Sequence, residues 1–441
     1  MFFLEESIRS IAGKPPVWWQ RVLLFILAAL LPFSVEVGLS PRDMVNIPSE
    51  PLIGIGLLLL LWDIGKSSRI WYHIFRKELI WVFPFMLAYI LTTLFSVNLM
   101  VSVKSSVVNI TYILVFYALM IRVLMDKPSH FQAMMGFYAL GLFVVFVIAI
   151  IRMAEYDWNI LVVRALYHPF YKDHTLFGAT AAMMTAYFLT SRKRSQWLLG
   201  LVFLLAVFFS TSRGAILSLG VFAYTLVMMN SKFKKGFLVF AVMLFLIMSA
   251  VFVHVINDRL SAPAIIGHEY ADQSKGRTIV PNEIIPDVSS AERTNRWIAA
   301  WRMFFERPVT GFGPGTYQFV YIPYQDSAFF NRLTVSDISN IPEGSGGTAH
   351  SQYLLLASEM GLVGLLAFLL ILGRWVFLAI KCSKKLYANK HILIAIASLS
   401  TYLFHGFFNN FLTTDKFAFL FWGMGAFLVA GKGMKSSIVN D

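Results

Sequence analysis

Two neighbouring segments decide how this sequence is interpreted: SSAERTNRWIAAWRMFFERPVTGFGPGTY at residues 289–317 and TAHSQYLLLASEMGLVG at residues 348–364. The first carries arginines and tryptophans at helical spacing and ends in a Gly-rich turn. The second places a histidine at the start of an apolar run. Most of the sequence on either side consists of apolar runs long enough to lie in lipid. The two segments therefore form a polar connection in a chain that is otherwise suited to a membrane.

The composition excludes an ordinary soluble protein. Of the 441 residues, 58% are hydrophobic and 14% are charged, whereas soluble domains have about 25% charged residues. The apolar runs have spanning length, whereas an outer-membrane barrel would show alternating segments of about ten residues. We expect an all-α polytopic membrane protein.

The net charge of +13 does not indicate nucleic-acid binding, because the lysines and arginines form short clusters between apolar runs, as topogenic charges do. The single cysteine, Cys382, excludes an intramolecular disulfide, and the lysines around it predict a cytoplasmic position. No small-residue cleavage site follows the first apolar run, Val22–Phe33, so we expect a retained first span.

Hydropathy predicts about twelve transmembrane helices, of which the second is short and could be tilted or partly re-entrant. The main Lys/Arg clusters between them fall on one side, which the positive-inside rule makes cytoplasmic together with both termini. The connection at 257–348 is then periplasmic and is far longer than usual, which indicates a functional loop. It separates helices one to nine, in residues 1–256, from helices ten to twelve, in residues 349–441. The predicted spans are 17–38, 48–64, 78–97, 105–125, 129–152, 173–191, 196–211, 213–230, 236–256, 349–380, 389–410 and 414–432.

A helix is predicted inside the long loop. Ser289 and Glu292 have the S-x-x-E spacing of a capping box, which marks a helix start, and Pro308 with the glycines after it predicts the end. One face is expected to carry an apolar stripe headed by an arginine, with Arg296 about 60° away around the helix. The stripe consists of Arg293, Trp297, Ala300, Trp301 and Phe304.

His350 is the most informative single residue. With Thr348 as N-cap it is predicted to lie in the first turn of the tenth span, on the outer side. The helix dipole disfavours imidazolium there, so we expect a neutral imidazole able to accept a proton as a general base. The alternative is an interfacial histidine that only hydrogen-bonds the loop backbone.

Arg213 lies in FFSTSRGAILSL between two apolar runs, with almost no loop to hold it. A charge at that depth is costly and indicates function, and its natural partner is an anionic headgroup or a diphosphate. The alternative is an arginine that reaches to lipid phosphates. Arg293 and Arg296 allow the same two interpretations.

The glycines have structural interpretations. GFGPGT at 311–316 lacks the Lys-Ser/Thr pair of a phosphate-binding loop and does not follow a strand, so it predicts a turn. Gly361 and Gly364, in the predicted tenth span, are typical of small residues that let helices pack closely.

The remaining polar residues form no recognisable cluster. Asp415 and Lys416, at an outer turn, could pair with each other or line the site, and His174 opens the sixth span from the same side. Glu359 lies on the opposite helix face from His350. No His/Asp/Glu grouping has metal-ligand spacing, so neither a metal nor a cofactor is predicted.

Three motifs together resemble the O-antigen ligase and polymerase superfamily. They are SRGA, E-R-x-x-x-W-x-x-A-W-x-x-F-x-x-x-P-x-x-G-x-G-P-G and A-H-S-x-x-L-x-x-x-x-E-x-G-x-x-G, and they cover roughly Ser212–Ala215 and Glu292–Gly364. The predicted spans and the single long outer loop also agree with that family.

The resemblance implies a GT-C-like, metal-independent glycosyltransferase of the bacterial inner membrane. It would move a glycan from undecaprenyl diphosphate to a hydroxyl acceptor at the periplasmic face, with inversion. By motif, Arg213 and Arg293 match the family's arginines and His350 matches its histidine, whereas Arg296 has no secure counterpart. His174 stands near where relatives commonly have an asparagine.

Two acceptors fit this chemistry. A ligase would use the lipid A core oligosaccharide, which we favour, and a polymerase would use a second lipid-linked glycan. A transporter would have a similar number of spans, but it should show repeat symmetry and charges near mid-bilayer.

Overall fold

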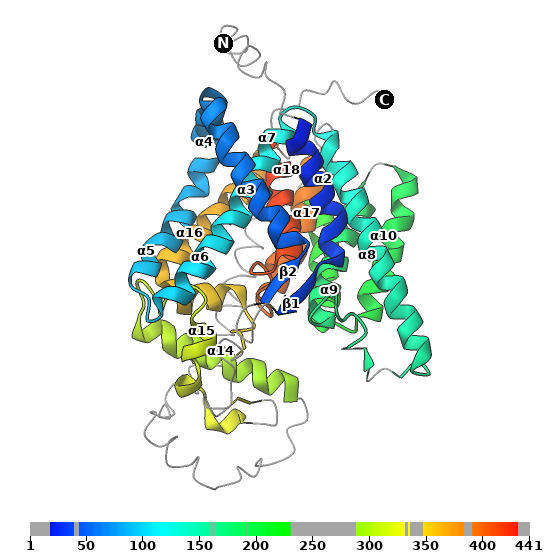
Figure 1. Ribbon diagram of the computed structural model, residues 1–441. Helices are drawn as coiled ribbons and strands as arrows, with labels where there is room; N and C mark the ends of the chain where they lie inside the picture. Colours follow the sequence, from blue (N-terminus) through cyan, green and yellow to red (C-terminus); the bar gives the residue numbers. More distant parts are fainter. Residues whose placement is uncertain are drawn as a thin grey trace.

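A computed structural model describes residues 18–38, 44–159, 162–163, 165–191, 193–230, 288–330, 334–335, 347–382 and 390–430. The described chain is mostly helical (Figure 1). Its elements are α2 (Trp18–Leu30), η1 (Leu31–Phe33), β1 (Val35–Gly38), β2 (Met44–Ile47), α3 (Ser49–Lys66), α4 (Ser68–Lys77), η2 (Leu79–Trp81), α5 (Phe83–Leu94), α6 (Leu99–Ile113), the π-helical η3 (Leu114–Leu119), α7 (Met120–Leu124), α8 (Ser129–Glu155), α9 (His174–Leu189), α10 (Arg194–Phe209), α11 (Arg213–Asn230), α14 (Val288–Glu306), α15 (Tyr317–Val320), η5 (Ile322–Tyr324), η6 (Ser327–Phe329), α16 (Gln352–Cys382), α17 (Lys390–His405) and α18 (Asp415–Ala430).

Three helices in the described residues are long and apolar enough to cross a membrane: Leu99–Leu124, Ser129–Glu155 and Gln352–Lys381. The pair α3 and α4, bent by 106°, makes a fourth if it is counted as one span. Shorter apolar helices include α2 with η1, α5, α10, α11 and α17. A helix lies at every predicted span except 236–256, which falls outside the described residues. The chain is therefore a predominantly helical protein of membrane character.

One predicted span is wrong at its end. The first was expected to run to residue 38, but η1 ends at Phe33, and the chain then forms the two-stranded antiparallel sheet of β1 and β2. Val35 faces Ile47 in its register. Alternating β-branched residues in both strands favour this pairing, and the small sheet is an addition to a predominantly helical protein.

The centre of the bundle is α18. Every residue from Asp415 to Val429 is buried, and the helix packs against α17, η3 and α7 (Figure 1). α9, which is also buried along most of its length, packs against α10, α11 and α17. The ends of α17, α11 and α9 are thereby brought together in space.

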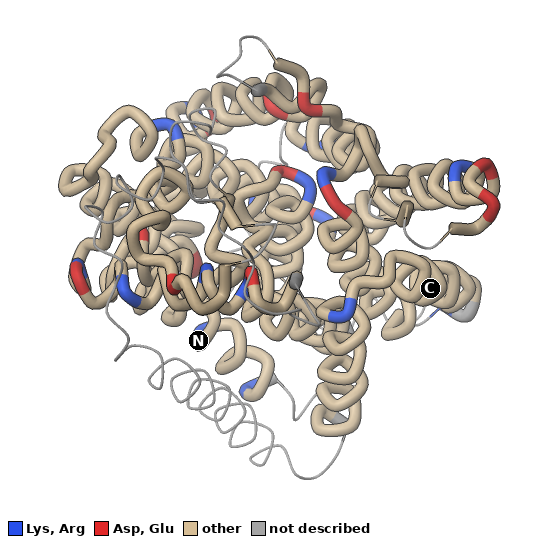
Figure 2. Tube along the Cα trace, turned by 90° about the horizontal axis from the view of Figure 1, so that it is seen from below, with Lys and Arg blue, Asp and Glu red and all other residues tan. Residues whose placement is uncertain are grey.

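The amphipathic helix α14 lies across one end of the bundle, opposite the end that carries α4 and α7 (Figure 1). It packs against α16. Seen from the α14 end, charged residues are sparse along the helices (Figure 2). The predicted loop helix is confirmed, with bounds Val288–Glu306.

α16 is broken at Gly361, whose φ of 61° and ψ of −157° are not helical. Backbone groups freed at the break pair with the Gly-rich turn that follows α14: Leu362 N donates to Pro308 O at 2.8 Å, and Gly313 N donates to Glu359 O at 2.7 Å. The prediction that Gly361 is a position of close packing is confirmed, because a Cβ there would collide with the backbone of Val309 and Thr310. The same glycine also permits the kink.

The predicted turn at GFGPGT is confirmed. Gly311, Gly313 and Gly315 have φ values of 64°, 111° and 79°, which favour glycine. A Cβ on Gly311 would collide with the backbone of Glu359. Beyond the turn, Tyr317 N donates to the Glu359 carboxylate at 2.9 Å. The turn thus fixes α14 to the kink of α16, and Glu359 serves this junction.

Candidate active site

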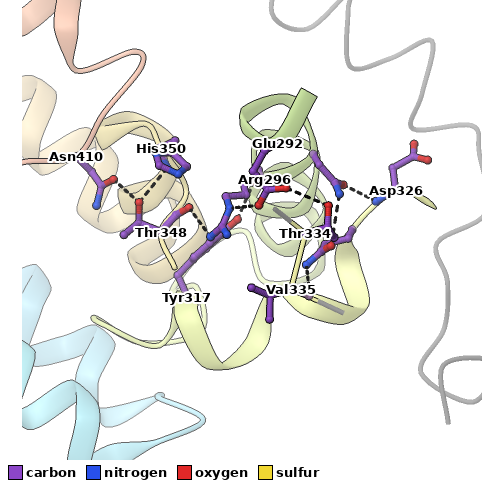
Figure 3. A network of polar contacts seen from close by, with 11 residues as sticks. Glu292, Arg296, Tyr317, Asp326, Thr334, Val335, Thr348, His350 and Asn410 are labelled. Carbon is purple, nitrogen blue, oxygen red and sulfur yellow. Dashed lines mark hydrogen bonds and ion pairs between the residues drawn. The ribbon is translucent and has the colours of Figure 1, made fainter. Parts of the chain in front are cut away.

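His350 lies just before α16, not in its first turn as predicted. Its φ of 47° is left-handed, and the helix begins at Gln352. Ser351 is the capping side chain, since its Oγ accepts from Leu354 N at 3.4 Å. Thr348 Oγ1 instead accepts from His350 N at 3.2 Å and donates to Asn410 Oδ1 at 2.7 Å (Figure 3). Hydroxyl side chains compete with helix starts by making such local turns.

α14 supplies one wall around His350. Trp297 Nε1 donates to the His350 carbonyl at 3.0 Å. Burial, then the charges of Arg296 and Arg293, lower the pKa of His350 to about 3, against the opposing effects of Asp173 and of a hydrogen bond to the Asn409 side chain. The neutral imidazole expected from the sequence is therefore present, but burial and the arginines cause it.

Arg296 is held on all sides and is buried. Its Nε lies 2.6 Å from Glu292 Oε1 (Figure 3). Its guanidinium lies 5.0 Å from the Tyr321 ring centre. Gly347 has a φ of 92°, and any Cβ there would collide with the Arg296 guanidinium. These contacts make Arg296 a part of the junction between α14 and the segment before α16.

The buried face of α14 differs from the predicted stripe. Arg293, Trp297, Trp301 and Phe304 are only partly buried, although Ala300 is fully buried. The buried face also contains polar residues, which are Glu292, Asn295 and Arg296. The Glu292 carboxylate accepts hydrogen bonds from Arg296 and, at 3.1 Å, from Thr334 Oγ1. It therefore does not form the predicted capping box. Asn295 Oδ1 accepts from Asp326 N at 2.7 Å.

Replacing Arg296 with alanine is expected to destabilise the fold. The variant would leave the Glu292 carboxylate buried without its cation, and breaking a buried ion pair costs about 3–5 kcal/mol. Thermal unfolding of the purified protein in detergent measures this effect. Arg293→Ala, one turn earlier on the same helix and on its partly exposed side, is the matched control and should unfold close to wild type. Equal melting temperatures for Arg296→Ala and wild type would contradict the structural role.

Arg213 is the first residue of α11, and its side chain is exposed. Ser212 Oγ accepts from Ala215 N at 3.4 Å, which fixes the first turn of this helix. A Cβ on Gly214 would stand 3.0 Å from Nε2 of His405, at the end of α17. The SRG motif is therefore packed against α17.

The charge of Arg293 links His350 with the contact between α11 and α17. Its charge acts on both His350 and His405, and so does the carboxylate of Asp173. Asp173 caps α9, since its Oδ1 accepts from Leu176 N at 2.8 Å. The structure thus groups Arg293, Asp173 and the two histidines near the start of α11.

Two candidate residues have a different placement. His174 is the first residue of α9, partly buried beside Asp173, and it is Asp173 that acts on His350. Asp415 accepts a short hydrogen bond from Ser49 Oγ, and Lys416 Nζ donates to Ser34 O at 2.7 Å. Asp415 and Lys416 therefore tie α18 to the chain around the small sheet.

Sequence reasoning missed His405 and Asn409. His405 is 1% exposed, and its Nδ1 lies 3.5 Å from Asn409 Nδ2. Both residues fell inside the predicted span 389–410 and were treated as part of an apolar helix. The available signal was a histidine within an apolar span, which indicates function by default.

Residues 198–369 match the family model for O-antigen ligase. The matched range includes Arg213, Arg293 and His350, together with the Gly-rich turn and the kink of α16. A comparison with curated proteins found no match. The resemblance deduced from the three motifs is thereby confirmed: this chain carries a domain of the O-antigen ligase family.

Proposed function

We propose that this chain is an O-antigen ligase that transfers a glycan from undecaprenyl diphosphate to a hydroxyl of the lipid A core oligosaccharide. The observation that carries the proposal is the grouping of Arg293 with His350, beside the helix that begins with Arg213, inside the family domain. A cationic group for a diphosphate and a neutral imidazole for a hydroxyl proton are the two groups that this transfer needs.

The transfer is a single displacement. The acceptor oxygen forms a bond to the anomeric carbon, the bond from that carbon to the diphosphate oxygen breaks, and the configuration inverts. Arg213 and Arg293 stabilise the charge that develops on the leaving undecaprenyl diphosphate. His350 takes the acceptor proton. No cofactor and no metal ion takes part in this proposal.

Donor binding would also activate the base. In the free protein, burial and the arginines hold the pKa of His350 at about 3, well below the range in which a general base is most effective. A bound diphosphate brings negative charge that offsets Arg293 and Arg296, and a nearby negative charge favours imidazolium. The base therefore becomes stronger when the donor is in place.

The membrane placement is part of the same proposal. We propose a GT-C-like bundle of about twelve spans in the inner membrane, with both termini cytoplasmic and the α14 end periplasmic. The partly exposed Trp297, Trp301 and Phe304 suit the headgroup level, where aromatic residues gather. The apolar outer faces of the helices would hold the polyprenyl tail.

Cysteine labelling tests this orientation. In a Cys382→Ser background, a cysteine replacing Glu155, the exposed last residue of α8, is expected to react with an impermeant thiol reagent added to intact spheroplasts. A cysteine replacing Lys77, the exposed last residue of α4, should react only after the membrane is broken. The reverse pattern would place the α14 end in the cytoplasm and contradict the proposal.

The polymerase alternative differs only in its acceptor. Purified protein with an undecaprenyl-diphosphate glycan should extend lipid A core and leave a second lipid-linked glycan unextended. Extension of the glycan alone would make the chain a polymerase. The transporter alternative is less favoured, because Arg293 and Arg296 act on His350 and the helix that begins with Arg213 packs nearby, so these groups form one site.

A further inference from the structure

His350 has a backbone conformation that residues other than glycine rarely adopt. Its φ of 47° is left-handed, and α16 begins only at Gln352. Such a conformation costs free energy in an L-residue and persists only where the surrounding contacts enforce it. Residues of this kind gather at active sites, where the strain is part of the mechanism. The contacts that hold the backbone of His350 therefore decide how its imidazole is placed.

Two segments that are distant in sequence hold this backbone. On α14, Trp297 Nε1 donates to the His350 carbonyl at 3.0 Å. The His350 N–H donates to Thr348 Oγ1 at 3.2 Å, and Thr348 Oγ1 donates to Asn410 Oδ1 at 2.7 Å (Figure 3). Asn410 lies between α17 and α18 and is 7% exposed. Both polar backbone groups of His350 thus have a side chain as partner.

The Asn410 side chain sets the orientation of the Thr348 hydroxyl. A hydroxyl has one hydrogen to donate and two lone pairs that accept. Because this hydrogen is directed at Asn410 Oδ1, a lone pair is left for the His350 N–H. Consecutive hydrogen bonds polarise and strengthen one another. The three residues therefore form one chain of hydrogen bonds that ends on the backbone of His350.

The residues on either side of His350 are held as well. Gln352 N donates to Gly406 O, just beyond the end of α17, at 2.7 Å. Arg296 Nη1 donates to Thr348 O at 3.4 Å. With its neighbours fixed, the freedom left to His350 is rotation of its own peptide groups, and this rotation is what the Thr348 hydroxyl opposes.

We propose that Thr348 and Asn410 are positioning residues that hold His350 in its left-handed conformation and so direct its imidazole at the acceptor hydroxyl. The catalytic value of this arrangement rests on the proposed function, in which His350 is the general base. The hold on the backbone does not depend on that function. Placement matters for a base of this kind, because a displacement of about 1 Å can cost on the order of 10²-fold in rate.

Hydrogen exchange at the His350 amide tests the hold without any measurement of activity. Full-length protein in detergent is exchanged in deuterated buffer, and a short peptide that contains His350 is followed by mass spectrometry. Thr348→Val keeps the shape of the side chain and removes the hydroxyl, and Asn410→Leu removes the partner of that hydroxyl. Each should exchange this amide roughly two- to tenfold faster than wild type, the change expected for one lost hydrogen bond. Wild-type protection in both variants would overturn the proposal.

Steady-state kinetics test the consequence for transfer. In Thr348→Val and in Asn410→Leu, kcat should fall by roughly tenfold or more, with KM for the lipid-linked donor unchanged. Thr348→Ser, which keeps the hydroxyl, should restore most of kcat and of the amide protection. Because both changes break the same chain, the double variant should lose no more than the more affected single variant. Losses that multiply in the double variant would overturn the chain from Asn410 through Thr348.

The matched control is Thr225→Val, which makes the same change at a buried threonine of α11 whose Oγ1 donates to Val221 O at 2.8 Å. It should leave both kcat and the exchange of the His350 amide at wild-type values. Full kcat in Thr348→Val, where His350→Ala is inactive, would overturn the positioning role alone. Faster exchange in Thr348→Val, with a wild-type protein that transfers no glycan, would uphold the hold on the backbone and overturn the proposed function.

Discussion

Purified His350→Ala is expected to transfer glycan about 10²–10⁴-fold more slowly than wild type, the contribution of a positioned general base. Without the imidazole, the acceptor proton has no group to receive it as the new bond forms. The measurement is product formation from an undecaprenyl-diphosphate glycan with the acceptor at saturation. Donor binding should change little, because the loss belongs to the chemical step.

The control for this variant is His73→Ala, which removes a histidine from α4 at the opposite end of the bundle. It should retain wild-type activity. The melting temperature of His350→Ala should stay near that of wild type, since the backbone bonds of this residue to Trp297 and Thr348 do not depend on its side chain. Wild-type transfer by a folded His350→Ala protein would exclude the general-base role.

Removal of either diphosphate-binding arginine should have the next largest effect. Arg293→Ala and Arg213→Ala are each expected to lower kcat about 10²–10³-fold, the loss typical when one stabilising group of a developing anion is removed. Lysine at either position should restore only part of the activity, because its ammonium is a point charge without the planar fork of a guanidinium. Steady-state transfer kinetics at several donor concentrations measure both effects.

Arg307→Ala is the matched control for Arg293→Ala. Arg307 follows the end of α14, is exposed and lies over the Phe312 ring at 4.7 Å. Its removal takes one positive charge from the same end of the molecule and should lower kcat far less. An equal loss in Arg307→Ala would show that general positive charge, and not the positions of Arg213 and Arg293, accounts for the activity.

Hydropathy located the helices because it is a property of about 20 consecutive residues. The signals that predicted the start and end of α14 are also local, because they lie in the helix and in the residues next to it. The errors lie where a distant segment decides the local structure. The helix break at Gly361 exists because the segment after α14 supplies partners for its backbone, and no window around Gly361 contains that information.

The buried face of α14 was not predictable for a related reason. Hydropathy assigns tryptophans to the interior and charged residues to water, yet Glu292 and Arg296 are buried and Trp301 is partly exposed. Their burial is stable because Thr334 and the Thr348 carbonyl, far along the chain, complete their hydrogen bonds. Polar residues buried with their partners look like surface residues in a sequence.

The candidate site was predictable only where a motif existed. Arg213, Arg293 and His350 stand in motifs that resemble a family, and the family match covers all three. His405 and Asn409 stand in no such motif, and it is the packing of α17 against α11 that brings His405 to Gly214 of the SRG motif. That packing is long-range and leaves no mark on the local pattern.

The most direct test of the central claim is the stoichiometry of donor consumption. Purified protein, treated with a chelator and free of nucleotides, is incubated with a labelled undecaprenyl-diphosphate glycan and lipid A core. The account predicts one undecaprenyl diphosphate released for each glycan transferred, at a rate that the chelator does not lower. Donor that remains intact with lipid A core and also with a second lipid-linked glycan would contradict it, as would transfer that occurs only from a nucleotide sugar.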